Sequence, residues 1–180
     1  MLRRSAILRG KEVLLRPPVA EDFDEVARLM KASQRAYRGR IHPFKGRRQF
    51  DEYLATSSDE ECFRFLICRS FDGRIVGTIS LFMIHRKSFQ NAVVGYMVGV
   101  PYARRGYGTE ALKLIVQFAF GPLKLHRVEA NIQPDNAASL ALVRRVGFQR
   151  EGYSSRFLKI GGRWRDHERW AILAEGGHKP

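Results

Sequence analysis

Residues 92–112, AVVGYMVGVPYARRGYGTEAL, decide the fold of this chain. The segment up to residue 98 is largely apolar and rich in valine, and the breakers Gly99 and Pro101 follow it, so it predicts a buried strand rather than a helix. A helix is predicted after the loop, because apolar side chains recur there at helical spacing. These side chains are Ala111, Leu114, Ile115, Phe118 and Ala119. The segment is therefore expected to fold as a strand, a glycine loop and a helix.

The loop between this strand and helix carries two glycines and two arginines. Gly106 and Gly108 allow a sharp turn whose backbone N–H groups converge on one point, where the positive end of the helix dipole also favours an anion. Arg104 and Arg105 add positive charge there. An isolated Gly-x-Gly is often a plain turn, but the strand before it and the helix after it favour a phosphate site.

The same loop also fits the fingerprint of a dinucleotide-binding fold. Residues 106–111, GYGTEA, match G-x-G-x-x-A, and Glu129 follows at about the 20-residue spacing expected for the acidic partner. Two features argue against this interpretation. A stretch containing Pro101 and both arginines separates Gly99 from Gly106, whereas a dinucleotide fold turns tightly out of its strand, and the chain lacks further strand–helix repeats.

Length and composition indicate one ordinary domain. The 180 residues are enough for a single core, and we expect one domain over residues 1–180 with its core from about residue 10 to about residue 175. Hydrophobic residues make up 44% and charged residues 28% of the chain, typical of a soluble globular protein. No apolar run approaches the roughly 18 residues that span a membrane, and the basic N-terminus has no signal-peptide core. We expect a cytoplasmic protein without membrane contact.

The titratable residues that most often bind metals are scattered. The five histidines have no metal-ligand spacing to one another or to Cys62 and Cys68, so no metal is expected. The two cysteines lie six residues apart in one predicted strand, which argues against a disulfide between them. The formal net charge of +14 implies an anionic partner, for which coenzyme phosphates and nucleic acid are both candidates.

Around the central segment the chain alternates short strands and helices. Strands are predicted over residues 12–16, 63–69, 74–84, 127–132, 152–159 and 164–173, and helices over about 21–30, about 47–55 and from residue 137 to the cap at Gly147. Asp72-Gly73 and Gly161-Gly162 are hairpin signals. The order β-α-α-β-β-β-α-β-α-β-β predicts a mixed α/β sheet with one strand–helix–strand unit at its centre.

One segment is strongly basic. Residues 31–48 contain no acidic residue, and Tyr37, His42 and Phe44 are interleaved with seven basic side chains. These are Lys31, Arg35, Arg38, Arg40, Lys45, Arg47 and Arg48. The run fits a solvated helix–loop surface and equally a surface that docks on RNA or on an acidic substrate.

Residues 94–167 resemble the GNAT superfamily of N-acetyltransferases, and within it the RimJ and RimL type of ribosomal-protein N-terminal acetyltransferase. The first segment that carries the resemblance is Gly95-Tyr96 with residues 105–112, RGYGTEAL. The second is residues 126–130, HRVEA, with Asn136, Ser139 and Gly147-Phe148. The third is residues 151–153, EGY, with residues 162–167, GRWRDH. The resemblance implies a single α/β (α+β) domain whose mixed, mostly antiparallel twisted sheet contains a central β-α-β acetyl-CoA-binding unit.

The resemblance also implies where acetyl-CoA binds. The pyrophosphate would lie on residues 104–109, and the pantetheine arm would run between strands 92–98 and 127–132, bonding free backbone groups of residues 97–100. One of those N–H groups would polarise the thioester carbonyl. The expected coenzyme-binding residues are Met97, Val98, Gly99, Val100, Arg104, Arg105, Gly106, Tyr107, Gly108, Thr109, Asn131 and Asn136. Asn136 is placed either to bond the pantetheine arm or to cap the following helix, and both roles can hold.

The catalytic residues implied by the resemblance are fewer. Ser139 matches the serine near the coenzyme sulfur and could protonate the leaving thiolate. The tyrosine that many members use as the general acid falls on Val143, and the glutamate that often precedes Gly95 falls on Val93. Glu129 is the candidate base, because its position in the strand opposes the core-facing residues, although pairing with a neighbouring arginine fits it as well. Tyr153, Asp166, His167 and a solvent relay are the remaining alternatives.

Three kinds of acceptor remain open from the sequence. They are a protein N-terminus, a small-molecule amine, and none at all in a coenzyme-sensing or RNA-binding module. The branch resemblance favours a protein N-terminus that begins with a small residue such as Ala or Ser. The charge of +14 argues against polyamines and aminoglycosides, which need pockets lined with carboxylates. Ribosome or rRNA docking through residues 31–48 would fit a substrate presented near RNA.

Overall fold

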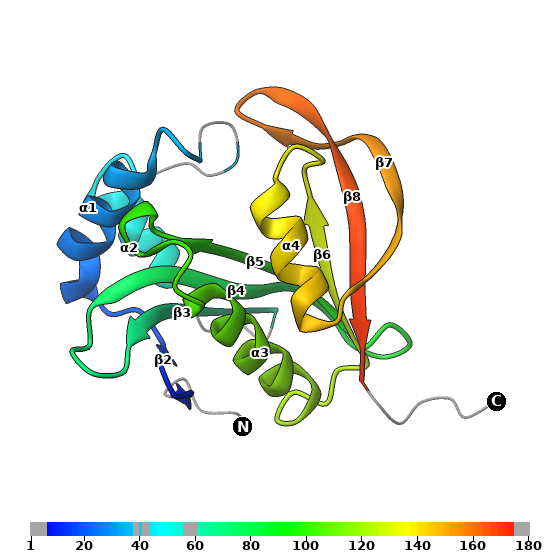
Figure 1. Cartoon of the computed structure of the whole chain (residues 1–180), viewed down its shortest axis with the longest axis horizontal. Coiled ribbons are helices and arrows are strands. Elements are labelled where there is room, and N and C mark those ends of the chain that lie inside the picture. Colours follow the sequence, from blue (N-terminus) through cyan, green and yellow to red (C-terminus); the bar gives the residue numbers. More distant parts are fainter. Residues whose placement is uncertain (1–6, 38–39, 41–43, 56–60, 175–180) are drawn as a thin grey trace.

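The computed structural model describes residues 7–37, 40, 44–55 and 61–174, whose strands form one eight-stranded sheet (Figure 1). The strands are β1 (Leu8–Arg9), β2 (Val13–Arg16), β3 (Cys62–Arg69), β4 (Ile75–His85), β5 (Asn91–Val98), β6 (Arg127–Ile132), β7 (Gln149–Ile160) and β8 (Arg163–Leu173). The helices are α1 (Phe23–Ser33), α2 (Arg47–Ala55), α3 (Tyr107–Phe120) and α4 (Ala137–Val146). The strand order is β1-β2-β3-β4-β5-β6-β8-β7.

The predicted order of strands and helices is confirmed. Each predicted element is present to within a few residues, including both hairpins, β3–β4 and β7–β8. The sequence analysis missed the two-residue strand β1, which exists only through its pairing with β2, and the 3-10 turn Val100–Tyr102 after β5. Cys62 and Cys68 both lie on β3 as free thiols.

The sheet is antiparallel throughout except between β5 and β6, which run parallel and are connected through α3. A parallel pair needs a crossover, and α3 provides it, so the central β-α-β unit is confirmed. The dinucleotide-binding alternative requires a doubly wound parallel sheet. One parallel pair in eight strands does not provide that sheet, and the fingerprint match at residues 106–111 is therefore coincidental.

The two parallel strands separate soon after they pair. Their pairing consists of Asn91 with Arg127, Ala92 with Val128 and Val93 with Glu129, yet β5 continues to Val98 and β6 to Ile132. In Figure 1, β5 runs across the molecule while β6 turns away from it. The sheet therefore opens at its centre, between a half that ends in β5 and a half that contains β6, β8 and β7.

Helices cover both faces of the opened sheet. Residues of α3, such as Leu112 and Ile115, pack with Val128 of β6 in the larger core, to which α4 also contributes. Helices α1 and α2 pack on the other face, in a smaller core that contains Phe50 and Met97. The two cores hold the walls of the opening in place from opposite sides of the sheet.

Candidate active site

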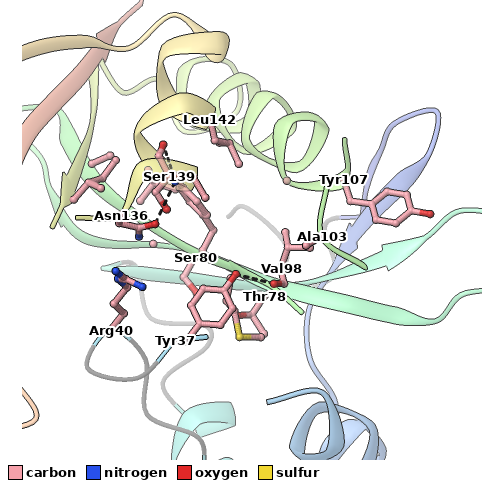
Figure 2. A pocket seen from close by; sticks show the side chains of 18 of the residues that line it. Tyr37, Arg40, Thr78, Ser80, Val98, Ala103, Tyr107, Asn136, Ser139 and Leu142 are labelled. Carbon is pink, nitrogen blue, oxygen red and sulfur yellow. Dashed lines mark hydrogen bonds between the residues drawn. The ribbon is translucent and has the colours of Figure 1, made fainter. Parts of the chain in front are cut away.

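A cavity of about 1030 Å³ occupies the opening between β5 and β6. Its walls come from the second half of β5, the loop before α3, the end of β6 and the first turns of α4. It continues past β4 and the loop after α1 to the β7–β8 hairpin. Figure 2 shows Asn136 and Ser139 of α4 facing the side of β4 and β5 across this space.

The loop before α3 is shaped to bind an anion. Gly106 is the N-cap of α3 in the left-handed conformation, with φ of 84°, and a Cβ added there would meet no atom within 4 Å. The carbonyl of Gly106 accepts the amides of Thr109 (2.9 Å) and Glu110 (3.1 Å), which leaves the earlier amides of the first turn without a helical partner. Arg104 is also left-handed, with φ of 64°, a conformation that is uncommon for non-glycine residues. The open space and converging amides fit a pyrophosphate.

The two glycines of the loop have different tasks. Gly106 permits the left-handed turn, whereas Gly108 permits close packing, since a Cβ there would lie 2.9 Å from Leu142 and 3.2 Å from Val98. Tyr107 lines the cavity at the loop, but its side chain is buried, and in Figure 2 its ring points away from Ser139. The ring of Tyr107 therefore belongs to the core, and only its backbone is available to a group bound at the loop.

The carboxylate of Glu110 ties this helix to the start of the sheet. It accepts the amides of Lys11 at 2.6 Å, Glu12 at 2.9 Å and Val13 at 3.0 Å. Nothing in the local sequence around Glu110 indicates these partners, which lie almost 100 residues away. The contact fixes the first turn of α3, and with it the anion loop, against β2.

The backbone groups of residues 97–100 were expected to face the opening, but only some of them do. The Gly99 amide donates to the Val76 carbonyl of the β4 side at 2.8 Å, and the Val100 amide donates to the hydroxyl of Ser33 at 3.0 Å. Hydrogen-bonded and non-hydrogen-bonded pairs alternate in antiparallel strands, so Val98 directs its backbone groups away from β4. Its carbonyl accepts the Tyr37 hydroxyl at 2.7 Å, as Figure 2 shows.

The N-terminus of α4 brings two expected residues to the cavity. Asn136 is the helix N-cap, and its side-chain oxygen accepts the Ser139 amide at 3.3 Å. Both residues line the cavity, as does Asn131 of β6. Tyr96 of β5 reaches across to the Ser139 carbonyl with its hydroxyl at 3.5 Å, and burial raises the pKa of Tyr96 to about 12. Tyr96 therefore presents a protonated hydroxyl beside Ser139 at neutral pH.

Glu129 is not brought to this cavity. It lies where β5 and β6 are still paired, and it accepts Arg127 Nε at 2.7 Å and Asn91 Nδ2 at 3.2 Å. Arg127 also binds Glu151 in a second ion pair. Glu129 is absent from the cavity wall, and none of the described residues that line the cavity is an Asp or Glu. The geometry supports the ion-pair interpretation of Glu129 and gives no support to its use as a base.

The part of the cavity beyond Val98 and Ser139 is basic, aromatic and apolar. Arg40 and Arg64 line it from the N-terminal half of the chain, and Leu158 and His167 line it from the β7–β8 hairpin. Arg40 also reaches the loop before α4, where it pairs with Asp135 at 2.9 Å. In the described ranges, no group of three or more His, Cys, Asp and Glu side chains could hold a metal ion.

The opening between β5 and β6, with a glycine loop at the N-terminus of α3 beside it, fits the site of an acyltransferase for a nucleotide-linked thioester. The model of the family described as "Acetyltransferase (GNAT) domain" matches residues 12–149, so the chain belongs to the GNAT family. It is an acetyl-CoA-dependent N-acetyltransferase.

Proteins similar to this chain are named as acetyltransferases. The "Probable N-acetyltransferase YjcK" of Bacillus subtilis is 34% identical over 175 residues, which is 93% of this chain and 97% of YjcK. The "[Ribosomal protein uS5]-alanine N-acetyltransferase" of Escherichia coli is 36% identical over 93 residues, 52% of this chain and 48% of that protein. The structure of Mycobacterium smegmatis RimJ in complex with CoA-disulfide has a TM-score of 0.83 at 28% identity, covering 97% of this chain and 89% of RimJ.

No helix in the described part of the chain is long and apolar enough to cross a membrane.

Proposed function

We propose that this acetyltransferase modifies the N-terminal α-amino group of a protein, and of ribosomal proteins in particular, by direct attack of the amine in a ternary complex. The observation that carries the proposal is the chemistry of the half of the cavity beyond Val98 and Ser139, called here the acceptor half. Within the described ranges the charged residues that line it are Arg40 and Arg64, and no carboxylate lines it. A polycationic acceptor would meet strong repulsion there, whereas the single ammonium group of a peptide would meet less.

The same cavity supports the rest of the reaction. The loop at residues 104–109 would hold the pyrophosphate, and the Val98 amide would polarise the thioester carbonyl as an oxyanion donor does. The amine would attack the carbonyl carbon from the acceptor half, and the C–S bond would then break. Ser139, with Tyr96 beside it, would return a proton to the departing thiolate.

A thiol-release assay over four acceptor types tests the proposal. The acceptors are peptides that begin with Ala or Ser, peptides whose only amine is an internal lysine, spermidine and an aminoglycoside. We expect turnover on the first type, with the acetyl group on the α-amine by mass spectrometry. Turnover only on spermidine or the aminoglycoside would defeat the proposal and favour the alternative of a small-molecule amine acceptor.

Arg40→Ala is expected to raise the KM for an N-terminal peptide about tenfold, a loss of the size typical of one or two hydrogen bonds. Arg40 Nε is buried without a hydrogen-bond partner in the described residues, so it can donate to a peptide carbonyl, and the Asp135 pair holds it beside α4. Acetyl-CoA affinity, measured by calorimetry, should stay within about twofold because Arg40 is remote from the anion loop.

Arg35→Ala is the matched control for Arg40→Ala. Arg35 comes from the same basic segment and is exposed, and it does not line the cavity. An equal rise in KM from both variants would attribute the effect to general charge and remove Arg40 from the acceptor site.

The proposal extends to docking on the ribosome through residues 31–48. Lys31, Arg35 and Lys45 are exposed, whereas Arg47 and Arg48 form ion pairs with Asp51 and Glu52 of α2. Arg38 and His42 lie outside the described residues. Arg47 and Arg48 are exposed as well, so the described part of residues 31–48 offers five exposed cations for docking, two of them paired with carboxylates.

Salt is expected to separate docking from catalysis. Binding to ribosomal particles should weaken about tenfold or more between 50 and 200 mM salt, because several phosphate contacts release counterions, while turnover of a short peptide should change little. Co-sedimentation and the thiol-release assay measure the two quantities. Equal salt sensitivity of both would remove the reason for assigning a docking role to residues 31–48.

A further inference from the structure

His167 is a buried histidine in the wall of the acceptor half. It lies on β8 opposite Ser154 of β7 and is 2% exposed, yet it lines the cavity. The next residue on β8, Glu168, pairs with Ile132 of β6. The side chains of this pair lie on the face of the sheet that carries α4. Successive side chains of a strand alternate between faces, so His167 lies on the opposite face, with Asn131.

The hydrogen bonding of His167 decides which nitrogen carries the proton. Nδ1 lies 3.0 Å from the carbonyl oxygen of Arg165, and a carbonyl oxygen can only accept, so Nδ1 carries the hydrogen. In a neutral imidazole the other nitrogen, Nε2, then has a free lone pair. Such a tautomer is suited to take a proton from a group that enters the cavity.

Burial, rather than the surrounding charges, favours the neutral imidazole. Burial is the largest effect and lowers the pKa of His167, while Asp166, next to it on β8, acts in the opposite direction. Glu168 pairs with Arg150 of β7. The β7 neighbour of the imidazole is the Phe157 ring, at 6.0 Å between ring centroids, and the charged groups that share the described cavity wall are arginines.

A bulge in β7 holds this arrangement. The pairing register of β7 with β8 shifts between Ser154 and Leu158, and Asp166 secures the extra residues by accepting the Tyr153 hydroxyl at 2.6 Å and the Arg156 amide at 2.7 Å. The bulge places Phe157 against the imidazole and Leu158 in the cavity wall. The ring of His167 is thus oriented by two strands.

No other group in the described cavity wall can play the same part. Besides His167, its titratable residues are tyrosines and arginines, residue types that are protonated at neutral pH. Burial raises the pKa of Tyr37, and also that of Tyr53. Glu129, the carboxylate expected from the sequence, is held by Arg127 outside the cavity.

We propose that His167 is the general base that accepts a proton from the acceptor ammonium through Nε2. The ammonium loses one proton to His167, and the freed amine forms a C–N bond with the acetyl carbon as the C–S bond breaks. The second nitrogen proton goes to the thiolate by way of Ser139 or solvent, and the imidazolium returns its proton to solvent. The inference rests on the proposed function, since it needs an amine that enters through the acceptor half.

His167→Asn tests the proposal, because the Asn amide can still donate to the Arg165 carbonyl but cannot accept a proton. At neutral pH we expect kcat to fall about 100-fold or more, the range of a lost general base, with acetyl-CoA affinity unchanged within about twofold. Wild-type kcat should be flat above about pH 6.5, whereas kcat of the variant should rise about tenfold per pH unit toward the pKa of the bound amine.

His126→Asn is the control, because His126 is exposed and outside the cavity wall, and it should leave kcat and its pH profile unchanged. A His167→Asn variant with the kcat of the wild type would overturn the proposal. A variant whose kcat is reduced equally at every pH would also overturn it, because structural damage alone gives that result.

A measurement made in the absence of any acceptor distinguishes a failure of this inference from a failure of the proposed function. Nitrogen-15 NMR of the imidazole in the wild-type protein, assigned by comparison with His167→Asn, should show a neutral ring with hydrogen on Nδ1. Hydrogen on Nε2 would overturn the inference whatever the acceptor. If the assay finds a small amine as the only acceptor, the proposed function fails, and the comparison of His167→Asn with wild type is made on that amine.

Discussion

Gly106→Glu is expected to abolish acetyl-CoA binding, with at least a 100-fold loss of affinity, about 3 kcal/mol. A Cβ at Gly106 would enter open space, so the new side chain is not excluded by the protein and instead occupies the place proposed for the pyrophosphate. Its carboxylate would repel that group and would compete for the free amides at the start of α3. Calorimetry with coenzyme A measures the loss directly.

Gly73→Glu is the matched control for this substitution. Gly73 is also left-handed, with φ of 72°, and has no atom within 4 Å of an added Cβ, but it lies in the β3–β4 hairpin, outside the cavity wall. Both substitutions place a side chain at a left-handed position and strain the turn in the same way. Only the Gly106 variant should therefore lose affinity for coenzyme A. Unchanged binding in Gly106→Glu, or binding of NAD without any response to coenzyme A, would contradict the assignment of this loop.

Ser139→Ala is expected to lower kcat about 100-fold while acetyl-CoA affinity stays within about twofold, as for a group that acts mainly in the transition state. The substitution removes the hydroxyl but keeps the Ser139 amide that Asn136 caps, so α4 should remain intact. Steady-state kinetics and calorimetry together separate the two quantities.

Asn136→Ala provides the contrast to Ser139→Ala. It removes the cap of α4 and should cost about 1 kcal/mol of unfolding free energy, measured by urea denaturation, together with coenzyme affinity if Asn136 also bonds the pantetheine arm. If Ser139→Ala lowers affinity and kcat together, Ser139 is a binding residue and the acid role passes to Tyr96 or to solvent.

The local parts of this site could be predicted because their causes lie within a few residues. The left-handed Gly106 before a helix, the Asn136 cap and the β7–β8 hairpin each depend on neighbouring residues, and each is present in the structure. The choice between a coenzyme A loop and a dinucleotide loop was harder from the sequence. It depends on whether the rest of the sheet, beyond the β5–β6 pair, also runs parallel, which no motif of six residues encodes.

Predictions about individual side chains in the cleft were less successful. The position of Glu129 in its strand is the one expected of a residue that faces the cavity, but β5 and β6 separate only beyond Glu129. Its carboxylate accepts hydrogen bonds from Asn91 and Arg127. Of residues 97–100, Gly99 and Val100 use their amides elsewhere in the fold. These outcomes depend on strand register and on partners from other elements.

The sequence by itself determined the element order, the glycine loop before α3 and the family, because glycines, caps and hydrophobic periodicity act over short distances along the chain. Only the tertiary structure decided which side chains line the cavity beyond Val98 and Ser139. The Arg40–Asp135 pair joins residues 95 apart, and His167 reaches the cavity through the pairing of β8 with β6 and the bulge in β7. Side-chain direction in a sheet reverses with every residue, so strand pairing and bulges, set by contacts between distant segments, determine which side chains enter the cleft.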